Sequence, residues 1–350
     1  MLLDDAKAIG EIDRSNMLSI MEKTPARLVR PVDALSTCRG DFGTLENVVL
    51  GGVGGSGIVG DILSDYCRQS TDVPVAVCRT LGIPKFIGKR TLFVAISYSG
   101  ETQETLGQLQ QAMRKRARVV AITSGGRLLS RAKSKNMPYL RVPSDLPPRL
   151  TLPELVASAT FVMGSAKLLR NTSGLLTRAA KSLSDLIEKV RPTVQSQHND
   201  AKQMAQALID RLPLLIGDEA YGSVLRRFKN ELNENSKVPA LYYTLPEGYH
   251  DDIEGLSALR RLTNPQPIIL HTRNEVDGQR RTREELVRLL GELGFPPVLR
   301  FEGKGKDRLS QLLTAITFAD YVSVYLAILR GVDPVQLRLI PRFRQAMRGR

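Results

Sequence analysis

The sequence predicts an α/β protein with two domains, each built around a mostly parallel sheet. The chain has 350 residues, which is long enough for two domains of ordinary size. Short apolar stretches alternate with amphipathic helical stretches between residues 45 and 143, and the same alternation restarts near residue 212. Strands that alternate with helices in this way form parallel sheets through right-handed crossovers.

The first half of the chain begins with helical periodicity over 4–22 and then contains five expected strands. Three of the strands are each followed by a turn and a helix. The strand-containing stretches are 45–63, 73–79, 90–115, 117–135 and 137–143. A proline-rich turn and a long apolar helix follow at 144–169, so the chain is expected to leave the first sheet there.

The second half follows a polar helical stretch that runs to about residue 211. The strand-containing stretches of this half are 212–237, 239–251, 266–273 and 296–303. A helix is expected at 282–294, and a long helix follows the last strand. We therefore expect an N-terminal domain at 1–155, a helical connection at 156–200 and a C-terminal domain at 201–350.

The composition is that of a globular protein, with 42% hydrophobic and 25% charged residues. No apolar run approaches the roughly 20 residues that cross a bilayer, and the N-terminal segment lacks the layout of a signal peptide. We expect a soluble, cytoplasmic protein with no membrane partner. Cys38, Cys67 and Cys78 are odd in number and lack metal-ligand spacing, so we expect buried or half-buried thiols. No metal or other cofactor is expected.

The net charge of +14 favours an anionic partner. Basic residues cluster modestly at 114–118 and 342–350 and are otherwise scattered, and aromatic residues make up only 5% of the chain. Zinc-finger and RNA-recognition patterns are missing from the sequence. We interpret the clusters as solvated surface, and we expect an anionic small molecule and no specific nucleic acid.

A glycine-rich turn at 51–57, with the sequence GGVGGSG, follows the first expected strand and opens a helix. Glycines allow the backbone to pass close to a ligand, and a helix N-terminus presents N–H groups to an anion. The turn is not a Walker loop, because no Gly-Lys-Ser/Thr follows. Gly55 and Ser56 are the candidate phosphate-binding residues here.

A second turn, at 97–102, carries hydroxyl groups in the same position relative to its strand. Ser97, Ser99 and Thr102 can each donate to a phosphate oxygen, whereas a simple helix cap accounts for only one hydroxyl. Glu101 and Glu104 are interpreted as residues of the first helical turn, where acids are favoured. The two turns together predict a phosphate site at the carboxyl edge of the parallel sheet.

The combination of GGVGGSGIVGD, ISYSGETQET and ITSGG resembles a SIS (sugar isomerase) domain, which is a phosphosugar-binding fold. The resemblance covers about 45–145, and it implies that the second half is a paired SIS domain. It further implies that each domain has three layers, with helices on both faces of its sheet.

Further segments resemble one family within this group, the bifunctional phosphoglucose/phosphomannose isomerases. These are NENSK at 233–237 with His250 downstream, the Pro-Arg segment that contains Arg149, and LAILRGVDP at 326–334. The resemblance spans nearly the whole chain. It implies interconversion of glucose 6-phosphate and fructose 6-phosphate, with mannose 6-phosphate as a further substrate.

Aldose–ketose isomerisation moves a proton between C1 and C2 through a cis-enediol. It requires a carboxylate base, a cation near the developing oxyanion and a group that opens the sugar ring. We expect Glu234 as the base, Arg149 as the cation and His250 as the proton carrier in ring opening. In the family this histidine comes from the neighbouring subunit, so the resemblance implies a homodimer.

The sequence departs from the family near its C-terminus, where the family has a lysine that helps to open the ring. The register from 326–334 places Arg344 at that position. Arginine keeps the positive charge but gives up a proton far less readily than lysine. Arg342, Arg348 and Lys237 are alternatives for this role.

Two other functions remain open from the sequence. One is a different SIS-domain phosphosugar isomerase, such as a ketose-amine isomerase. The other is a SIS-domain sugar-phosphate sensor in a regulator, a class that usually carries an N-terminal helix-turn-helix segment. The residues before the first glycine turn are few and interrupted by prolines, which disfavours such a segment.

Overall fold

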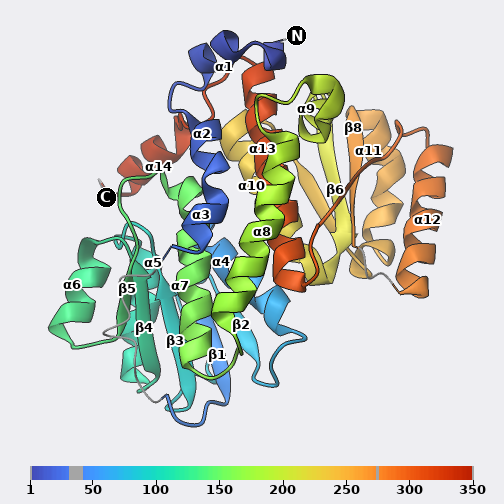
Figure 1. The fold of residues 1–350 in the computed structure, drawn as a ribbon. Coiled ribbons are helices and arrows are strands. Elements are labelled where there is room, and N and C mark those ends of the chain that lie inside the picture. Colours follow the sequence, from blue (N-terminus) through green and yellow to red (C-terminus); the bar gives the residue numbers. More distant parts are fainter. Residues whose placement is uncertain (1, 31–41, 273–275, 349–350) are drawn as a thin grey trace. The chain divides into compact units, whose positions relative to one another are not determined.

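The computed structural model describes residues 2–30, 42–272 and 276–348 (Figure 1). The chain packs as two compact units with one parallel sheet each, which confirms the predicted α/β class. The first-sheet unit comprises Lys23–Leu183 and Gly305–Leu312. The second-sheet unit comprises Met1–Glu22, Ser184–Lys304 and Leu313–Arg350.

The first sheet has five parallel strands in the order β2-β1-β3-β4-β5. They are β1 (Asn47–Gly51), β2 (Val75–Cys78), β3 (Thr91–Ile96), β4 (Arg118–Thr123) and β5 (Tyr139–Arg141). Every residue of the central strand β3 is buried. Its uninterrupted apolar sequence is typical of a parallel strand that is covered on both faces.

Helices cover both faces of the first sheet (Figure 1). On one face, Leu109 of α5 (Gln103–Arg114) and Leu128 of α6 (Gly126–Ser134) share a core cluster with Phe93. On the other face, α4 (Gly54–Cys67) packs against β1 and β2. The remaining helices that begin in this unit are α3 (Thr24–Leu28), η2 (Pro148–Thr151), α7 (Leu152–Ser165), α8 (Thr172–Val190) and α13 (Arg308–Leu329), which continues into the second-sheet unit.

The second sheet has four parallel strands in the order β7-β6-β8-β9. They are β6 (Leu212–Asp218), β7 (Leu241–Leu245), β8 (Pro265–His271) and β9 (Leu299–Glu302). One face packs against α11 (Leu256–Leu262) and α12 (Asp277–Glu292). On the other face, Phe228 of α10 (Gly222–Glu231) and Phe318 of α13 (Arg308–Leu329) each lie 5.7 Å from Phe301, measured between ring centroids.

Smaller helical elements complete the second-sheet unit. They are η1 (Leu2–Asp4), α1 (Ala6–Ile12), α2 (Met17–Glu22), η3 (Ser196–His198), α9 (Asp200–Ala207), η4 (Glu219–Tyr221), η5 (Leu232–Ser236), η6 (Glu247–Tyr249), η7 (Asp252–Gly255) and α14 (Leu339–Arg348).

The N-terminal helices pack with the second-sheet unit, whereas the sequence-based boundaries placed them in a continuous N-terminal domain. The buried ammonium group of Lys202, on α9, holds η1 in place. It donates to the carbonyl oxygen of Leu3 at 2.5 Å, to Asp4 at 3.1 Å and to the carbonyl oxygen of Pro192 at 2.8 Å. Burying an ammonium group is costly unless its hydrogens are bonded, so these contacts fix the helix to this unit.

Among the described residues, α13 is the one helix long and apolar enough to cross a bilayer. Its most apolar window is 89% buried inside the protein. It also carries buried polar side chains, including Ser310, Gln311 and Ser323. These features are typical of a core helix.

Candidate active site

Three turns meet at the carboxyl edge of the first sheet. Strands β1, β3 and β4 are neighbours and run parallel, so Gly51, Ile96 and Thr123 end at the same edge. The turn after β1 contains 52–57, the turn after β3 contains 97–102, and the turn after β4 begins at Ser124. Ligands of open parallel sheets bind at this edge.

The first turn brings its backbone against the end of β3 and then opens α4. A Cβ atom at Gly52 would lie 2.8 Å from the carbonyl oxygen of Ile96, so only glycine fits there. Gly54 has a φ of +58°, and a Cβ atom at Gly54 or Gly55 would face open space. Val53, the N-cap of α4, gives its helix no side-chain cap. The start of α4 therefore presents backbone N–H groups to a space that an anion can occupy.

The second turn brings the predicted hydroxyl groups together with the first turn. The amide of Tyr98 donates to Oγ of Ser56 at 3.3 Å. The hydroxyl groups of Ser97 and Thr102 lie 2.9 Å apart and share one hydrogen bond. Since one of this pair donates to the other, the second hydroxyl has a proton that this bond does not use. Ser99 is exposed beside them.

Glu101 does not have the role that the sequence predicted. Helix α5 begins at Gln103 with Thr102 as its N-cap, so Glu101 precedes the helix, whereas Glu104 does lie in its first turn. The carboxylate of Glu101 instead accepts from the backbone amide of Arg127 at 2.8 Å and from its Nε at 2.7 Å. It therefore holds the start of α6 against the second turn.

The third turn was part of the sequence resemblance, but we assigned it no role. Its Ser124 donates to the carbonyl oxygen of Tyr98, through the amide at 2.9 Å and through the hydroxyl at 2.6 Å. Gly100 has a φ of +68°, and a Cβ atom there would lie 1.9 Å from the carbonyl oxygen of Gly125. The second and third turns thus touch backbone to backbone, and this contact depends on Gly100.

Arg149 lies in η2, on a segment that is fixed at both ends within the first-sheet unit. The hydroxyl of Tyr98 donates to the carbonyl oxygen of Leu146 at 2.8 Å, which joins the segment to the second turn. On the other side, Arg27 makes two contacts of 2.6 Å with the carboxylate of Glu154 and also donates to the carbonyl oxygen of Leu150. Arg149 itself is buried.

Glu234 lies on η5, a π-helical turn that continues α10. The sequence placed this residue at a helix end and did not predict the π-helical turn. Such turns add one residue to a helix and often occur at functional sites. The side chain of Glu234 is half-buried, and the residues after it are held by α13. Asn235 donates to Ser323 Oγ at 2.9 Å, and Ser236 donates to the Ser323 carbonyl oxygen at 2.6 Å.

Lys237 ends the π-helical turn in the left-handed conformation, with a φ of 56°. Its ammonium group donates to three carbonyl oxygens, those of Glu234 at 2.6 Å, Asn235 at 3.1 Å and Asp333 at 3.3 Å. An ammonium group has three N–H donors. Lys237 therefore caps the turn, and this use of its hydrogens disfavours it as the ring-opening acid.

His250 lies in an exposed loop at the end of η6. Its ring packs against Tyr249, with 4.4 Å between the ring centroids, and its amide donates to the carbonyl oxygen of Glu247 at 2.8 Å. The loop is acidic. Burial raises the pKa of Asp252, and the carboxylates of Asp251 and Glu247 raise it further.

Arg344 lies on α14, where its side chain is exposed. Leu339, Phe343 and Met347 form an exposed apolar stripe on the same helix. The structure thus places His250 and Arg344 on separate exposed segments of the second-sheet unit, and it brings Ser56, Ser97 and Thr102 together in the first-sheet unit.

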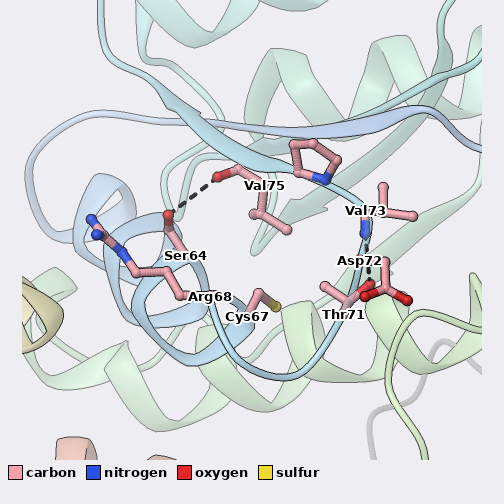
Figure 2. Close-up of a pocket in the computed structure, with 8 residues that line it drawn as sticks. Ser64, Cys67, Arg68, Thr71, Asp72, Val73 and Val75 are labelled. Atoms are coloured by element: carbon pink, nitrogen blue, oxygen red, sulfur yellow. Dashed lines mark hydrogen bonds between the residues drawn. The ribbon is translucent and has the colours of Figure 1, made fainter.

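A cavity of about 360 Å³ lies at the other end of α4, where the chain turns into β2. Figure 2 shows its lining, which consists of Ser64, Cys67, Arg68, Thr71, Asp72, Val73, Pro74 and Val75. Ser64 donates to the carbonyl oxygen of Val75 at 3.2 Å. None of the predicted site residues lines this cavity, which lies at the opposite edge of the sheet from the three turns.

Cys67, in the wall of this cavity, should be almost unreactive in the folded protein. Burial raises the pKa of its thiol to about 12, and only the thiolate is nucleophilic. At pH 8 we expect alkylation by iodoacetamide to be at least about 100-fold slower in the folded than in the urea-unfolded chain. Peptide mass spectrometry separates Cys67 from Cys78 and from Cys38, which lies outside the described residues. Equal rates in both states would contradict the burial.

No group of three or more His, Cys, Asp or Glu side chains in the described part of the chain is arranged to hold a metal ion.

A family model described as "Bacterial phospho-glucose isomerase C-terminal SIS domain" matches residues 197–347. Two curated relatives, from Caldicellulosiruptor bescii and Thermoplasma acidophilum, are both named bifunctional phosphoglucose/phosphomannose isomerase. They are 31% and 32% identical to the chain, and each alignment covers 85% of it and 88% of the relative. The chain belongs to the bifunctional phosphoglucose/phosphomannose isomerase family. The family resemblance found in the sequence is confirmed.

A solved structure supports the fold of this bifunctional isomerase family member. A glucose-6-phosphate isomerase-like protein from Thermus thermophilus aligns with a TM-score of 0.66 over 99% of each chain, at 16% identity. The curated isomerases align over 297 and 303 residues, which is longer than either unit, so the family match includes parts of both.

Proposed function

We propose that the protein reversibly isomerises glucose 6-phosphate and fructose 6-phosphate, and also accepts mannose 6-phosphate, by proton transfer through a cis-enediol. The observation that carries the proposal is the family membership, over 85% of the chain. The alternative of a different phosphosugar enzyme is favoured by one relative, named D-glucosamine-6-phosphate 4-epimerase and from Sulfolobus acidocaldarius, which is 28% identical to the chain over 89% of it.

The turns of the first sheet are proposed to bind the substrate phosphate. The N–H groups at the start of α4, including that of Gly55, and the hydroxyls of Ser56, Ser97, Ser99 and Thr102 are the donors. The shared hydrogen bond between Ser97 and Thr102 supports this role, because it orients two hydroxyls together. Phosphate is common to all three substrates, so these residues bind them without distinguishing among them.

Glu234 is proposed as the base that carries the proton between C1 and C2. Hydrogen bonds of Asn235 and Lys237 hold the backbone of its π-helical turn, which supports a defined position for the residue, and its half-burial leaves the side chain accessible. Arg149 is proposed to stabilise the negative charge of the enediolate. Its buried position on a fixed segment suits a charge that must be oriented before the reaction.

His250 and Arg344 are proposed to assist ring opening. The exposure of His250 supports a role in the active site of a neighbouring subunit, and we therefore propose a homodimer. The family membership supports a cytoplasmic location, which we also propose. Light scattering coupled to size-exclusion chromatography tests the dimer directly. A monomer at the assay concentration would contradict the proposal that His250 acts in the active site of a neighbouring subunit.

A coupled assay tests the function. Fructose 6-phosphate is supplied with glucose-6-phosphate dehydrogenase and NADP, and mannose 6-phosphate is supplied with the same coupling enzyme. We expect NADPH formation from both substrates without an added metal. Activity on neither substrate would overturn the proposal, and activity on fructose 6-phosphate alone would restrict it to one reaction.

Replacing Arg344 with lysine should speed the reaction of the ring-closed substrate. A lysine ammonium group releases a proton more readily than a guanidinium group, so we expect a kcat increase of about threefold. Arg342→Lys is the comparison variant, since Arg342 is exposed on the same helix and is the alternative position for this role, and a rise in kcat there alone would move the role to Arg342. An unchanged kcat for Arg344→Lys, or equal changes in kcat in both variants, would show that Arg344 does not take part in ring opening.

A further inference from the structure

A buried set of charged side chains in the second-sheet unit has no part in the proposed chemistry. Arg227 of α10 donates through Nε and Nη2 to the two carboxylate oxygens of Asp320 on α13, each at 3.0 Å. Its Nη1 lies 2.8 Å from Oε1 of Glu231, one helical turn further along α10. The side chains of Arg227 and Glu231 are each only 2% exposed. A charged group is buried in this way only when its partners are well placed.

Hydrogen bonds extend this set into a closed ring. Oε2 of Glu231 accepts from Nδ2 of Asn235 at 3.0 Å, and the same amide donates to Oγ of Ser323 at 2.9 Å. Oγ of Ser323 in turn donates to the carbonyl oxygen of Asp320 at 2.7 Å. The ring therefore joins α10, η5 and α13, and it passes through the residue that follows Glu234.

Electrostatics keep Arg227 charged. Burial acts to lower the pKa of Arg227, but the carboxylates of Asp320 and Glu231 outweigh it, so the pKa of Arg227 is raised. Glu234 is among the carboxylates that act on Arg227 in the same direction. The arginine therefore stays cationic, and it is close enough to the Glu234 turn for their charges to interact.

We propose that this ring positions the carboxylate of Glu234 for proton transfer, with Asn235 and Ser323 as positioning residues. The proposal rests on the role of Glu234 in the proposed function. Asn235 is fully buried and directs both amide hydrogens into the ring, so it acts through the turn and not by contact with substrate. The ring joins the π-helical turn by hydrogen bonds to residues of α10 and α13, and these bonds limit the movement of the turn.

The physical reason is the sensitivity of proton transfer to distance. A catalytic group displaced by about 1 Å can lose about 100-fold in rate. Without the Asn235 and Ser323 contacts, the backbone on the C-terminal side of Glu234 would keep the Ser236 bond and the Lys237 cap. We therefore expect a loose turn and not an unfolded one, so that kcat falls while binding of the phosphate is kept.

The test compares two variants that each remove one buried hydroxyl from α13. Ser323→Ala breaks the ring, whereas the control Tyr325→Phe removes a hydroxyl that donates to the carbonyl oxygen of Val190 at 2.5 Å. For Ser323→Ala we expect kcat with fructose 6-phosphate to fall about tenfold and KM to stay within about twofold. For Tyr325→Phe we expect kcat within about twofold of the wild type, although its melting temperature falls. Asn235→Ala should lower kcat further than Ser323→Ala.

Two results would overturn the inference. One is a kcat within about twofold of the wild type in both Ser323→Ala and Asn235→Ala. The other is an equal fall in kcat in Tyr325→Phe, which would show general loosening of α13. Wild-type and Glu234→Gln proteins are assayed beside these three variants. If the wild type is inactive, or if Glu234→Gln is active, both the proposed function and this inference are overturned. If the wild type is active and Ser323→Ala and Asn235→Ala keep its kcat, the inference alone is overturned.

Discussion

Glu234→Gln should lower isomerisation of both fructose 6-phosphate and mannose 6-phosphate by about 1,000-fold. Glutamine keeps the size of the side chain and can still form hydrogen bonds, but it cannot accept the proton that moves between C1 and C2. Binding should be retained, because the proposed phosphate donors belong to the turns of the first sheet. The measurements are the coupled assay for turnover and calorimetry with sorbitol 6-phosphate, an open-chain phosphosugar that has no carbonyl group to isomerise.

Glu247→Gln is the control for this substitution. Glu247 is an exposed glutamate of η6 in the same unit, and it lies three residues before His250. We expect its turnover to stay within about threefold of the wild type. Isomerisation that survives in Glu234→Gln would show that another group is the base. Loss of both turnover and sorbitol 6-phosphate binding would instead place Glu234 in binding.

Gly100→Ala should abolish phosphosugar binding and destabilise the first-sheet unit by about 3 kcal/mol. The backbone at Gly100 has a φ of +68°, which disfavours any residue with a Cβ atom. The new methyl group would also lie 1.9 Å from the carbonyl oxygen of Gly125, which is backbone and has to move as a whole. Relieving that clash separates the second and third turns and displaces Ser97 and Ser99.

Gly107→Ala is the matched control on α5. A Cβ atom at Gly107 meets nothing within 4 Å, and the residue lies inside the helix. Alanine there should stabilise the protein by about 0.5–1 kcal/mol, because alanine loses less backbone entropy than glycine in a helix. Urea titration measures both variants. Normal sorbitol 6-phosphate binding by Gly100→Ala would show that the contact between the turns is not required for the site.

The strands and the phosphate turns were predictable because their signals are local. An apolar run such as 91–96 has no polar alternation, which is typical of a parallel strand buried on both faces. Parallel neighbours end at a common edge, so glycine and hydroxyl residues after β1 and β3 were expected to meet. The hydrogen bond from Tyr98 to Ser56 shows that these two turns do meet.

Glu101 shows where local reasoning fails. Acids are favoured in the first turn of a helix, which is where the sequence placed Glu101, and nothing in the sequence indicated another role for it. The partner of Glu101 is Arg127, 26 residues later, and it becomes available only because β4 lies beside β3 and brings the start of α6 to the same edge. Strand order is a property of the tertiary structure.

By itself, the sequence determined the α/β class, the strands, the hydroxyl-rich turns and the family, because each depends on residues that are close in the chain or on a pattern shared with relatives. Only the tertiary structure decided how Glu234 is held. Arg227, Glu231 and Asn235 recur every four residues, a spacing that predicts one face of a helix and nothing more. Asp320, the partner of Arg227, lies 93 residues further along the chain, and packing of α13 against α10 brings the two charges into contact. Because the cost of burying a charge depends on partners distant in sequence, no local pattern could reveal the ring beside the proposed base.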